Sequence, residues 1–404
     1  MLISVSAWAD EAAKPLYSIT VAAETGSEAV IARLTKEMEN RFNVYNQLFR
    51  FDPSLLSAPL RVRAFLDKEA YHQYLTERLG SGIIEPEAMY LHYNQIENRE
   101  LVINLDNPAR ASMLAYQAFV QYLRAFISYP PTWMLEGFAI FFSTLSADQN
   151  GVLDYEENLN WLEPAKNLGD KLPSPNDILL ADMSGQFISG YMPSGLRPSG
   201  FRTPGQPASE NLLSANFAEF QIASWTLASF LLNGGSEYFR TLTESFMLLS
   251  PSAGTAVNSM AVSKRFSVWN DSDTMNRDFR DYLASRKTFR EYMEDGNRAY
   301  SRGDLENAEK FLTSAMELRP SDHAPYYFMG LIFYERSNFV TAEQFYLASL
   351  ERNADAALVN YALGINAAAE GRNQDAANYL NRAASLDPAR YRSRVDEVMR
   401  RIPR

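Results

Sequence analysis

Cysteine is absent from this sequence, and histidine occurs only three times in 404 residues. Without cysteine there are no disulfides, no thiolate metal sites and no cysteine nucleophile, so packing alone has to hold the fold together. An excess of basic residues is also missing. The formal net charge is -11, because 38 Lys and Arg face 49 Asp and Glu. Since phosphate recognition depends on clustered Lys and Arg, we expect no nucleic-acid partner.

Long hydrophobic runs are missing too, because no stretch approaches the roughly 20 consecutive apolar residues of a transmembrane helix. The apolar residues 1–9, MLISVSAWA, end in an Ala-x-Ala pattern before Asp10. This pattern is typical of the end of a secretory signal peptide at its cleavage site. We therefore expect an exported, periplasmic or extracytoplasmic protein whose mature chain begins at about Asp10. The alternative is a cytoplasmic protein with an apolar N-terminus.

What the chain does contain is an ordinary globular composition, with 46% hydrophobic and 22% charged residues. This length and composition predict two or three packed domains.

A 34-residue period marks the last third of the chain. The small and turn-forming residues in register are Gly296, Gly330 and Gly364; Ala308, Ala342 and Ala376; and Pro320 and Pro388. Small residues recur in this way where two helices of one repeat cross closely. The pattern resembles the tetratricopeptide repeat (TPR) family. That resemblance implies an all-α solenoid of three repeats (289–322, 323–356 and 357–390), followed by a capping helix at 391–404.

The resemblance also implies a groove lined by the first helix of each repeat. The residues expected there are Tyr300, Tyr327, Leu331, Tyr334, Tyr361 and Ile365. Tyrosine combines a broad apolar ring with a polar tip and is enriched in recognition surfaces. We therefore expect a protein or peptide partner in this groove. The alternative is that these tyrosines pack within the array or against the preceding domain.

The region from 10 to 287 has the pattern of an α+β domain that becomes mostly helical. Apolar residues alternate over 18–25 and recur at helical spacing over 29–49. Further patterns predict a strand and a helix over 59–75, two strands over 87–105, two apolar helices over 111–145 separated by SYPPTW, and helices from about 220 to 287. Residues 162–210 are rich in Gly, Pro, Ser and Asn, which predicts a long irregular loop.

The stretch PPTWMLEGFAIFF carries a second resemblance, through Pro131, Trp133, Leu135, Glu136 and Gly137. It resembles the gluzincin metallopeptidase domain, in which a preceding helix carries HExxH, with two zinc ligands and a general base. In the corresponding stretch AYQAFVQ, the ligand positions are Tyr116 and Val120 and the base position is Gln117; Glu136 occupies the place of the third ligand. The resemblance thus implies a pseudo-metallopeptidase without a catalytic residue, metal or cofactor.

Other interpretations of these residues remain open. Glu136 is alternatively a cap or dipole partner of its own helix, or one of two carboxylates of a hydrolase, with Asp177 or Asp182 as the second. A third interpretation is a protein that binds peptide or glycan in the former peptidase cleft. Our leading prediction is a non-catalytic interaction or assembly adaptor.

Overall fold

A computed structural model describes residues 15–22, 27–80, 86–107, 111–147, 153–154, 157–181, 208–269 and 271–401. The contacts within the chain divide it into unit 1, Met1–Arg286, and unit 2, Lys287–Arg404. Unit 1 combines a small sheet with many helices, and the described part of unit 2 is helical. This confirms, in its coarse form, the expected order of an α+β region followed by an all-α region.

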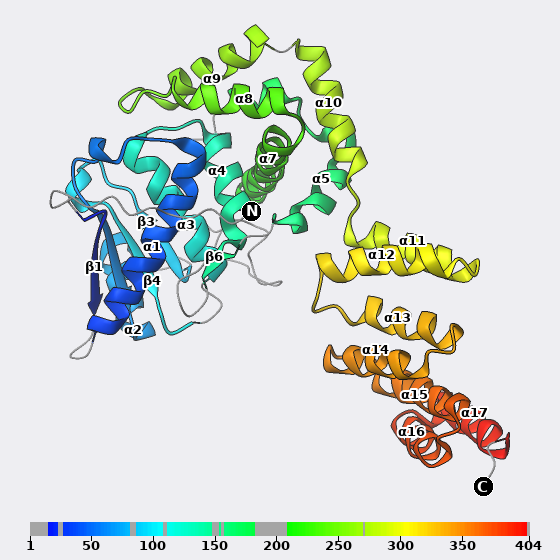
Figure 1. Cartoon of the computed structure of the whole chain (residues 1–404). Helices are drawn as coiled ribbons and strands as arrows, with labels where there is room; N and C mark the ends of the chain where they lie inside the picture. The colour runs from blue at the N-terminus through cyan, green and yellow to red at the C-terminus, as the bar shows by residue number, and fades with distance from the viewer. Residues whose placement is uncertain are drawn as a thin grey trace, which may run out of the picture. The chain divides into compact units, whose positions relative to one another are not determined.

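Unit 1 begins with a four-stranded mixed sheet (Figure 1). Its strands are β1 (Tyr17–Ala22), β2 (Leu60–Phe65), β3 (Ala88–Leu91) and β4 (Glu100–Asn104). Their order is β1-β2-β4-β3; β1, β2 and β4 are parallel, whereas β3 pairs antiparallel with β4 and forms an edge. Along β2, buried Leu60, Val62 and Ala64 alternate with half-buried Arg61 and Arg63, as expected for a strand with two different faces.

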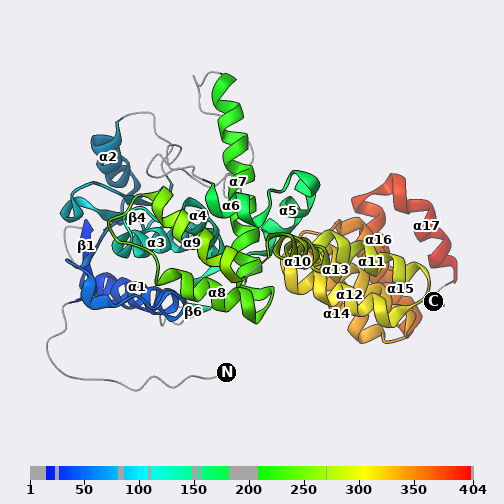
Figure 2. The same cartoon turned by 90° about the horizontal axis from the view of Figure 1, so that it is seen from above.

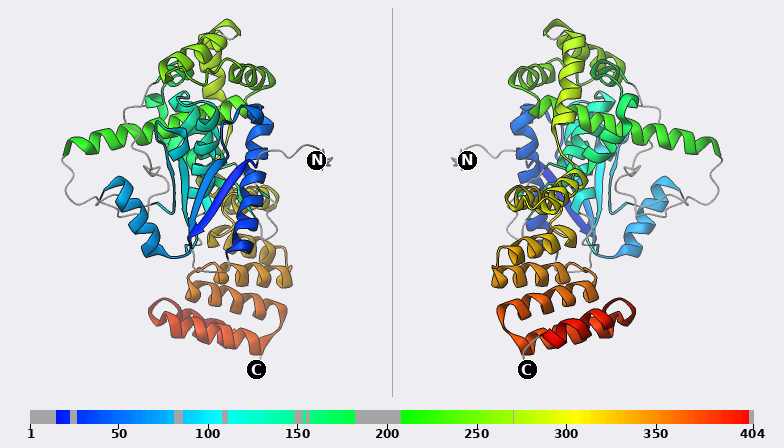
Figure 3. Two further views of the ribbon diagram at one scale, coloured as in Figure 1. Left: turned by 90° about the vertical axis from the view of Figure 1, so that its left-hand side faces the viewer. Right: turned by 90° about the vertical axis from the view of Figure 1, so that its right-hand side faces the viewer.

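Helices α1 (Glu28–Phe49) and α2 (Lys68–Leu79) lie on opposite sides of this sheet (Figure 3). The buried apolar side chains of α1 recur every three or four residues, at Leu34, Met38, Phe42, Tyr45 and Phe49. This spacing places them on one helical face. On the other side of the sheet, Tyr71 and Leu75 of α2 pack against Phe65, Met89 and Val102.

The centre of unit 1 is formed by α3 (Ala111–Phe126), α4 (Thr132–Phe141) and α7 (Ala208–Asn233). Every residue of α4 is buried, which explains its almost wholly apolar sequence. Pro130 and Pro131 separate α3 from α4, because proline cannot continue the helix that precedes it but can start the next. Gly137 permits the close approach of α4 to α7, since a Cβ atom there would lie under 3.0 Å from the carbonyl oxygen of Ser224.

The expected long loop at 162–210 is partly helical, so this prediction was wrong for its first third. α5 (Leu162–Leu168) and α6 (Pro175–Leu180) lie within it. Apolar side chains, among them Leu162 and Ile178, are buried against the core, and a capping box between Ser174 and Asp177 starts α6. Composition alone hid these short helices. Residues 182–207 lie outside the described part of the chain.

Three further helices complete unit 1: α8 (Ser236–Phe246), α9 (Thr255–Trp269) and α10 (Ser272–Ser285). Figure 2 shows α8 beside α9 and close to α1. The ring of Phe246 stacks on Phe49 of α1, with ring centroids 4.2 Å apart. Among the described residues of the whole chain, no helix combines the length and apolar character needed to cross a bilayer.

Unit 2 consists of three helical hairpins and one final helix. The hairpins pair α11 (Phe289–Ser301) with α12 (Leu305–Leu318), α13 (His323–Glu335) with α14 (Phe339–Glu351), and α15 (Ala356–Glu370) with α16 (Asn373–Leu386); the final helix is α17 (Pro388–Arg401). Each hairpin also contacts the first helix of the next, and α16 contacts α17.

The three hairpins share one crossing contact. A Cβ atom on Gly296, Gly330 or Gly364 would lie under 3.0 Å from the side chain 16 residues later, which is Leu312, Tyr346 or Leu380. The alanines that share the 34-residue period, Ala308, Ala342 and Ala376, are fully buried. The period in the sequence therefore coincides with a recurring close approach of paired helices.

Candidate functional sites

Glu136 is the central charged residue of unit 1. It lies in the middle of α4, where α4 faces α3 and α7, and its side chain is only 2% exposed. The hydroxyl of Tyr116 on α3 donates to Oε1 over 2.7 Å, and Nε2 of Gln221 on α7 donates to Oε2 over 2.8 Å. Both carboxylate oxygens therefore have a hydrogen-bond donor from a neighbouring helix.

The charge of this carboxylate is balanced against its burial. Burial raises the pKa of Glu136, whereas the hydrogen bonds from Gln221 and Tyr116 and the charge of Arg124 lower it. Burial also raises the pKa of Tyr116 well above its ordinary value, and the adjacent Glu136 raises it further. Tyr116 is thus a neutral donor near pH 7, and it cannot act as a phenolate ligand there.

The two other motif positions on α3 have different surroundings. Oε1 of Gln117 accepts a hydrogen bond from the backbone N–H of Tyr90 over 3.1 Å, which attaches α3 to the edge strand β3. Val120 is half-buried and packs against the core with an aliphatic side chain that offers no ligand atom. Tyr116 and Gln117 are therefore buried polar side chains that are hydrogen-bonded within the core.

Metal-ligating side chains are not gathered in this region. Within the described residues, no group of three or more His, Asp or Glu side chains has an arrangement that could hold a metal ion. His72 lies on α2, His92 follows β3 and His323 begins α13. Glu136 is the one acidic residue that the structure places beside Tyr116.

The structure bears on two alternative roles of Glu136, as a helix cap and as one of two catalytic carboxylates. Its side chain bonds to Tyr116 and Gln221, and Pro131 rather than Glu136 is the N-cap of α4, so the interpretation as a helix cap was wrong. Asp177 is exposed, and its carboxylate accepts from Ser174 in the capping box of α6. Asp182 lies outside the described residues.

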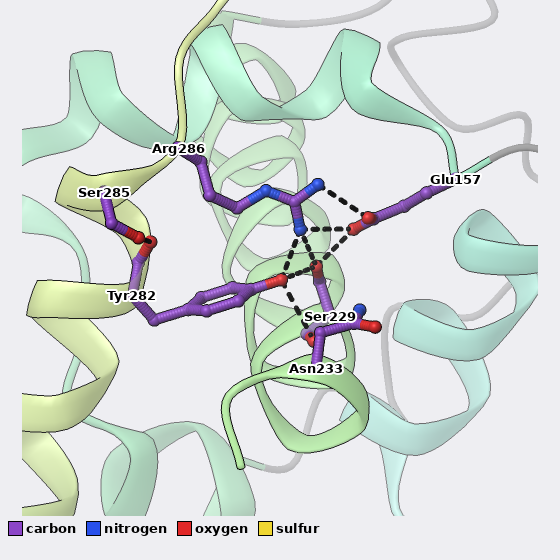
Figure 4. A network of polar contacts seen from close by, with 6 residues as sticks. All are labelled: Glu157, Ser229, Asn233, Tyr282, Ser285 and Arg286. Atoms are coloured by element: carbon purple, nitrogen blue, oxygen red, sulfur yellow. Dashed lines mark hydrogen bonds and ion pairs between the residues drawn. The ribbon is translucent and has the colours of Figure 1, made fainter.

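Neither Gln221 nor a second polar network in unit 1 (Figure 4) was predicted from the sequence. Arg286, which follows α10, donates to both carboxylate oxygens of Glu157, over 3.1 and 2.7 Å. Ser229 of α7 also donates to Glu157, and its hydroxyl lies 2.7 Å from that of Tyr282 on α10. Glu157 and Arg286 are 129 positions apart, so no local pattern could have linked them.

In unit 2, the six predicted groove residues are half-buried and occupy the first helices α11, α13 and α15. Tyr300 packs with Phe328, and Tyr327 lies 5.8 Å from the ring of Tyr346. Burial, with smaller contributions from nearby Tyr391 and Tyr300, raises the pKa of Tyr327 to about 12. The tyrosines of α11, α13 and α17 therefore act on one another electrostatically.

The last hairpin differs because α17 covers part of it. Tyr361 packs against Tyr391 of α17 with ring centroids 5.1 Å apart, and Ile365 belongs to the same cluster. Arg390 of α17 donates to Asp355 over 3.2 Å. Tyr361 and Ile365 thus contribute to the packing of α17, while Leu331 and Tyr334 pack in the cluster around Tyr346.

No protein-family model matches this sequence, and no significantly similar curated protein was found.

Proposed function

We propose that this protein is a non-catalytic interaction or assembly protein, in which unit 2 is a TPR array that binds a protein or peptide. The observation that supports this most is the 34-residue recurrence of one hairpin geometry, with a glycine at each helix crossing. Helical repeats stacked in this way bury a continuous core and expose an extended surface for partners. The half-buried tyrosines of α11 and α13 supply broad, rigid contact area on the first helices.

A binding experiment tests this proposal. The full chain, immobilised, captures partners from an extract of its native host, and mass spectrometry identifies them. Since Tyr300, Tyr327 and Tyr334 are half-buried, each is changed to Leu, which keeps apolar volume and helix propensity but removes ring and hydroxyl. We expect the triple variant to lose the partner while its helical circular dichroism persists.

The matched control changes exposed apolar side chains on the second helices α14 and α16. These are Val340, Leu347 and Leu386, which are between 41% and 59% exposed, and each becomes Ala. Either of two outcomes would show that the partner does not bind specifically to the first helices. One is retention of the partner by the tyrosine variant, and the other is loss of the partner to the same extent by the control.

We further propose that unit 1 is a pseudo-metallopeptidase domain of the gluzincin type. Catalytic zinc requires three protein ligands and an open position for water. Val120 has no atom that can ligate a metal, and Tyr116 is a neutral hydrogen-bond donor. Both oxygens of Glu136 already accept hydrogen bonds. The domain is therefore expected to contribute a folded scaffold rather than hydrolysis.

Metal analysis of protein purified without added zinc, together with a casein-cleavage assay with and without chelator, tests this second proposal. We expect substoichiometric zinc and no chelator-sensitive cleavage. Stoichiometric zinc, or cleavage that is lost in Glu136→Gln, would instead support the hydrolase.

Export is also a proposal, and it depends on residues 1–9, which lie outside the described part of the chain. N-terminal sequencing of the protein from its native host should find a start near Asp10. An intact Met1 in the cytoplasmic fraction would contradict export.

A further inference from the structure

An arginine without an acidic partner lies beside the edge strand of unit 1. Arg124 is half-buried near the end of α3, and within the described structure its side chain makes no hydrogen bond or ion pair. Other arginines of unit 1 have carboxylate partners: Arg41 pairs with Glu37, Arg63 with Glu100 and Arg286 with Glu157. A half-buried guanidinium with five unused donors is unfavourable unless an acceptor reaches it.

A second guanidinium increases the local positive charge. Arg99, just before β4, donates from Nε to the backbone oxygen of Tyr93 over 2.7 Å, which does not neutralise it. Burial lowers the pKa of Arg124, and the charge of Arg99 lowers it further. The carboxylate that acts on Arg124 is Glu136, whose oxygens already accept from Tyr116 and Gln221. Arg124 thus has one buried carboxylate in its surroundings but no direct contact with it.

His92 is near two aromatic rings and within electrostatic reach of both cations. Its ring is 5.9 Å from that of Tyr90 and 6.4 Å from that of Tyr129. Both ring nitrogens are buried and lack a hydrogen-bond partner. Burial and the charges of Arg124 and Arg99 lower the pKa of His92 to about 3. At pH 7 the imidazole is therefore neutral, with one N–H donor and one acceptor unused.

A small hollow lies on the Arg99 side of this cluster, and neither Arg124 nor His92 lines it. Its volume is about 40 Å³, and Tyr90, Arg99, Gln121 and Ala125 contribute to its lining. Gln121 is 2% exposed; its Nε2 donates to the backbone oxygen of Arg61, but its Oε1 has no donor. Such a volume holds a water molecule or a few ligand atoms. Arg99 and Gln121, whose Oε1 is a buried acceptor without a donor, thus line the same hollow.

We propose that Arg124, Arg99 and His92 form a binding site for an oxyanion, either the carboxylate or the phosphate group of a ligand. Guanidinium groups match the oxygen geometry of both groups. The neutral imidazole adds an N–H donor, and Oε1 of Gln121 accepts from a hydroxyl or N–H of the same ligand. The three residues lie on α3, directly after β3 and directly before β4. This proposal is independent of partner binding by unit 2.

The three histidines make the site directly observable. In the full chain with isotope-labelled histidine, ring signals are assigned with His92→Gln and followed by NMR. Inorganic phosphate is titrated in one arm and acetate in the other, with sodium chloride keeping the ionic strength constant. We expect a saturable shift of the His92 signals in at least one arm, with His72 and His323 unchanged; the responding arm identifies the anion class. The bound anion should also raise the pKa of His92, because it offsets the two cations.

Variants connect that shift to the cationic cluster. Arg124→Met should weaken anion binding by about tenfold or more, as expected for loss of a charge-assisted hydrogen bond. Arg240→Met, which changes an exposed arginine on α8, is the matched control and should leave binding unchanged. If Arg124→Met does not fold, Arg99→Gln replaces it. The proposal is overturned if neither anion shifts His92 in the wild-type protein before His72 and His323 respond, or if the folded variant binds as the control does.

Discussion

The contacts that join helices differ between unit 1 and unit 2 in the sequence separation of the residues that they connect. In unit 1, buried or partly buried polar contacts join residues 20, 85 and 129 positions apart, as in Tyr116–Glu136, Gln221–Glu136 and Glu157–Arg286. In unit 2, each crossing contact joins residues 16 positions apart and recurs in every hairpin. Damage should therefore be cooperative in unit 1 and more local in unit 2, since repeats mainly contact their neighbours.

Tryptophan separates the two units in experiments. All five tryptophans, at positions 8, 133, 161, 225 and 269, belong to unit 1. Tryptophan fluorescence therefore follows the unfolding of unit 1, whereas far-UV circular dichroism follows the helices of both units.

The largest contrast should come from adding one methyl group at a helix crossing. In Gly137→Ala the new Cβ atom meets the backbone oxygen of Ser224, which no rotamer change can remove. We expect a loss of about 3 kcal/mol or more in the free energy of unfolding of unit 1. In Gly330→Ala the Cβ atom meets the ring of Tyr346, a side chain that can shift, and alanine favours the helix by about 1 kcal/mol. The net loss in unit 2 should be about 1 kcal/mol.

Urea unfolding, followed by both probes, measures this pair. Equal losses in the two variants would contradict the distinction between a backbone and a side-chain obstacle. A fluorescence change in Gly330→Ala as large as in Gly137→Ala would contradict the local character of unit 2.

The polar contacts of Glu136 provide the next test. Glu136→Leu leaves the hydroxyl of Tyr116 and the amide of Gln221 without their acceptor, which destabilises unit 1. Removal of a buried carboxylate offsets part of this loss. We expect a net loss of about 2 kcal/mol. Glu136→Gln should be milder, because a glutamine can accept from Gln221 and donate to Tyr116. Fluorescence-detected unfolding at constant pH compares the two variants.

The free energy of unfolding of wild type relative to Glu136→Gln should change with pH in a definite direction. Burial raises the pKa of Glu136 in the folded protein above its value in the unfolded chain. The folded state therefore binds this proton more tightly, and the resulting stabilisation is fully present below the unfolded pKa and lost as the pH rises through the folded pKa. Glu136→Gln does not titrate. The stability of this variant relative to wild type should therefore increase as the pH rises through this range. A decrease would contradict a raised pKa of Glu136.

These same contacts separate what the sequence could predict from what it could not. The strands and central helices of unit 1 have local patterns, such as the alternation in β2 and the prolines before α4. The 34-residue period likewise located Gly296, Gly330 and Gly364 at helix crossings, because a close crossing requires a small residue. The acceptor role of Glu136 towards Gln221 has no such pattern, since it depends on how α7 packs against α4.

The candidate oxyanion site was also beyond prediction from sequence. Arg124 and Arg99 are 25 positions apart on different elements, and the packing of α3 on β3 brings Arg124 within electrostatic reach of His92. In the sequence, His92 is one of three histidines and belongs to no metal-binding motif. Its two unpartnered ring nitrogens became evident from the structure.

A smaller effect is expected from the Glu157–Arg286 pair. Arg286→Met removes two hydrogen bonds from Glu157, but the side chains are 22% and 16% exposed, so water partly replaces the lost partner. We expect a loss of about 1–2 kcal/mol in unit 1, less than for a fully buried pair. Fluorescence-detected unfolding measures it, and Arg240→Met is the exposed control. An effect equal to that of the control would show that the pair does not stabilise unit 1.

The smallest contrast compares the same capping motif in the two units. Thr288 caps α11 with both bonds of a capping box, since its hydroxyl accepts from the N–H of Glu291 over 3.1 Å and its own N–H donates to that carboxylate over 2.7 Å. Ser174 caps α6 in the same way, but both bonds are 3.3 Å long and α6 has only six residues. Thr288 is 4% exposed, so without its side chain the N-terminal amide of α11 is less easily hydrated.

We therefore expect Thr288→Ala to cost about 1 kcal/mol, detected by circular dichroism, and Ser174→Ala about 0.5 kcal/mol, detected by fluorescence. Substitution by glycine, which is tolerated at an N-cap, should reduce both losses to a few tenths of a kcal/mol. A larger loss at Ser174 than at Thr288 would show that the short helix α6 depends on its cap more than its hydrogen-bond lengths indicate.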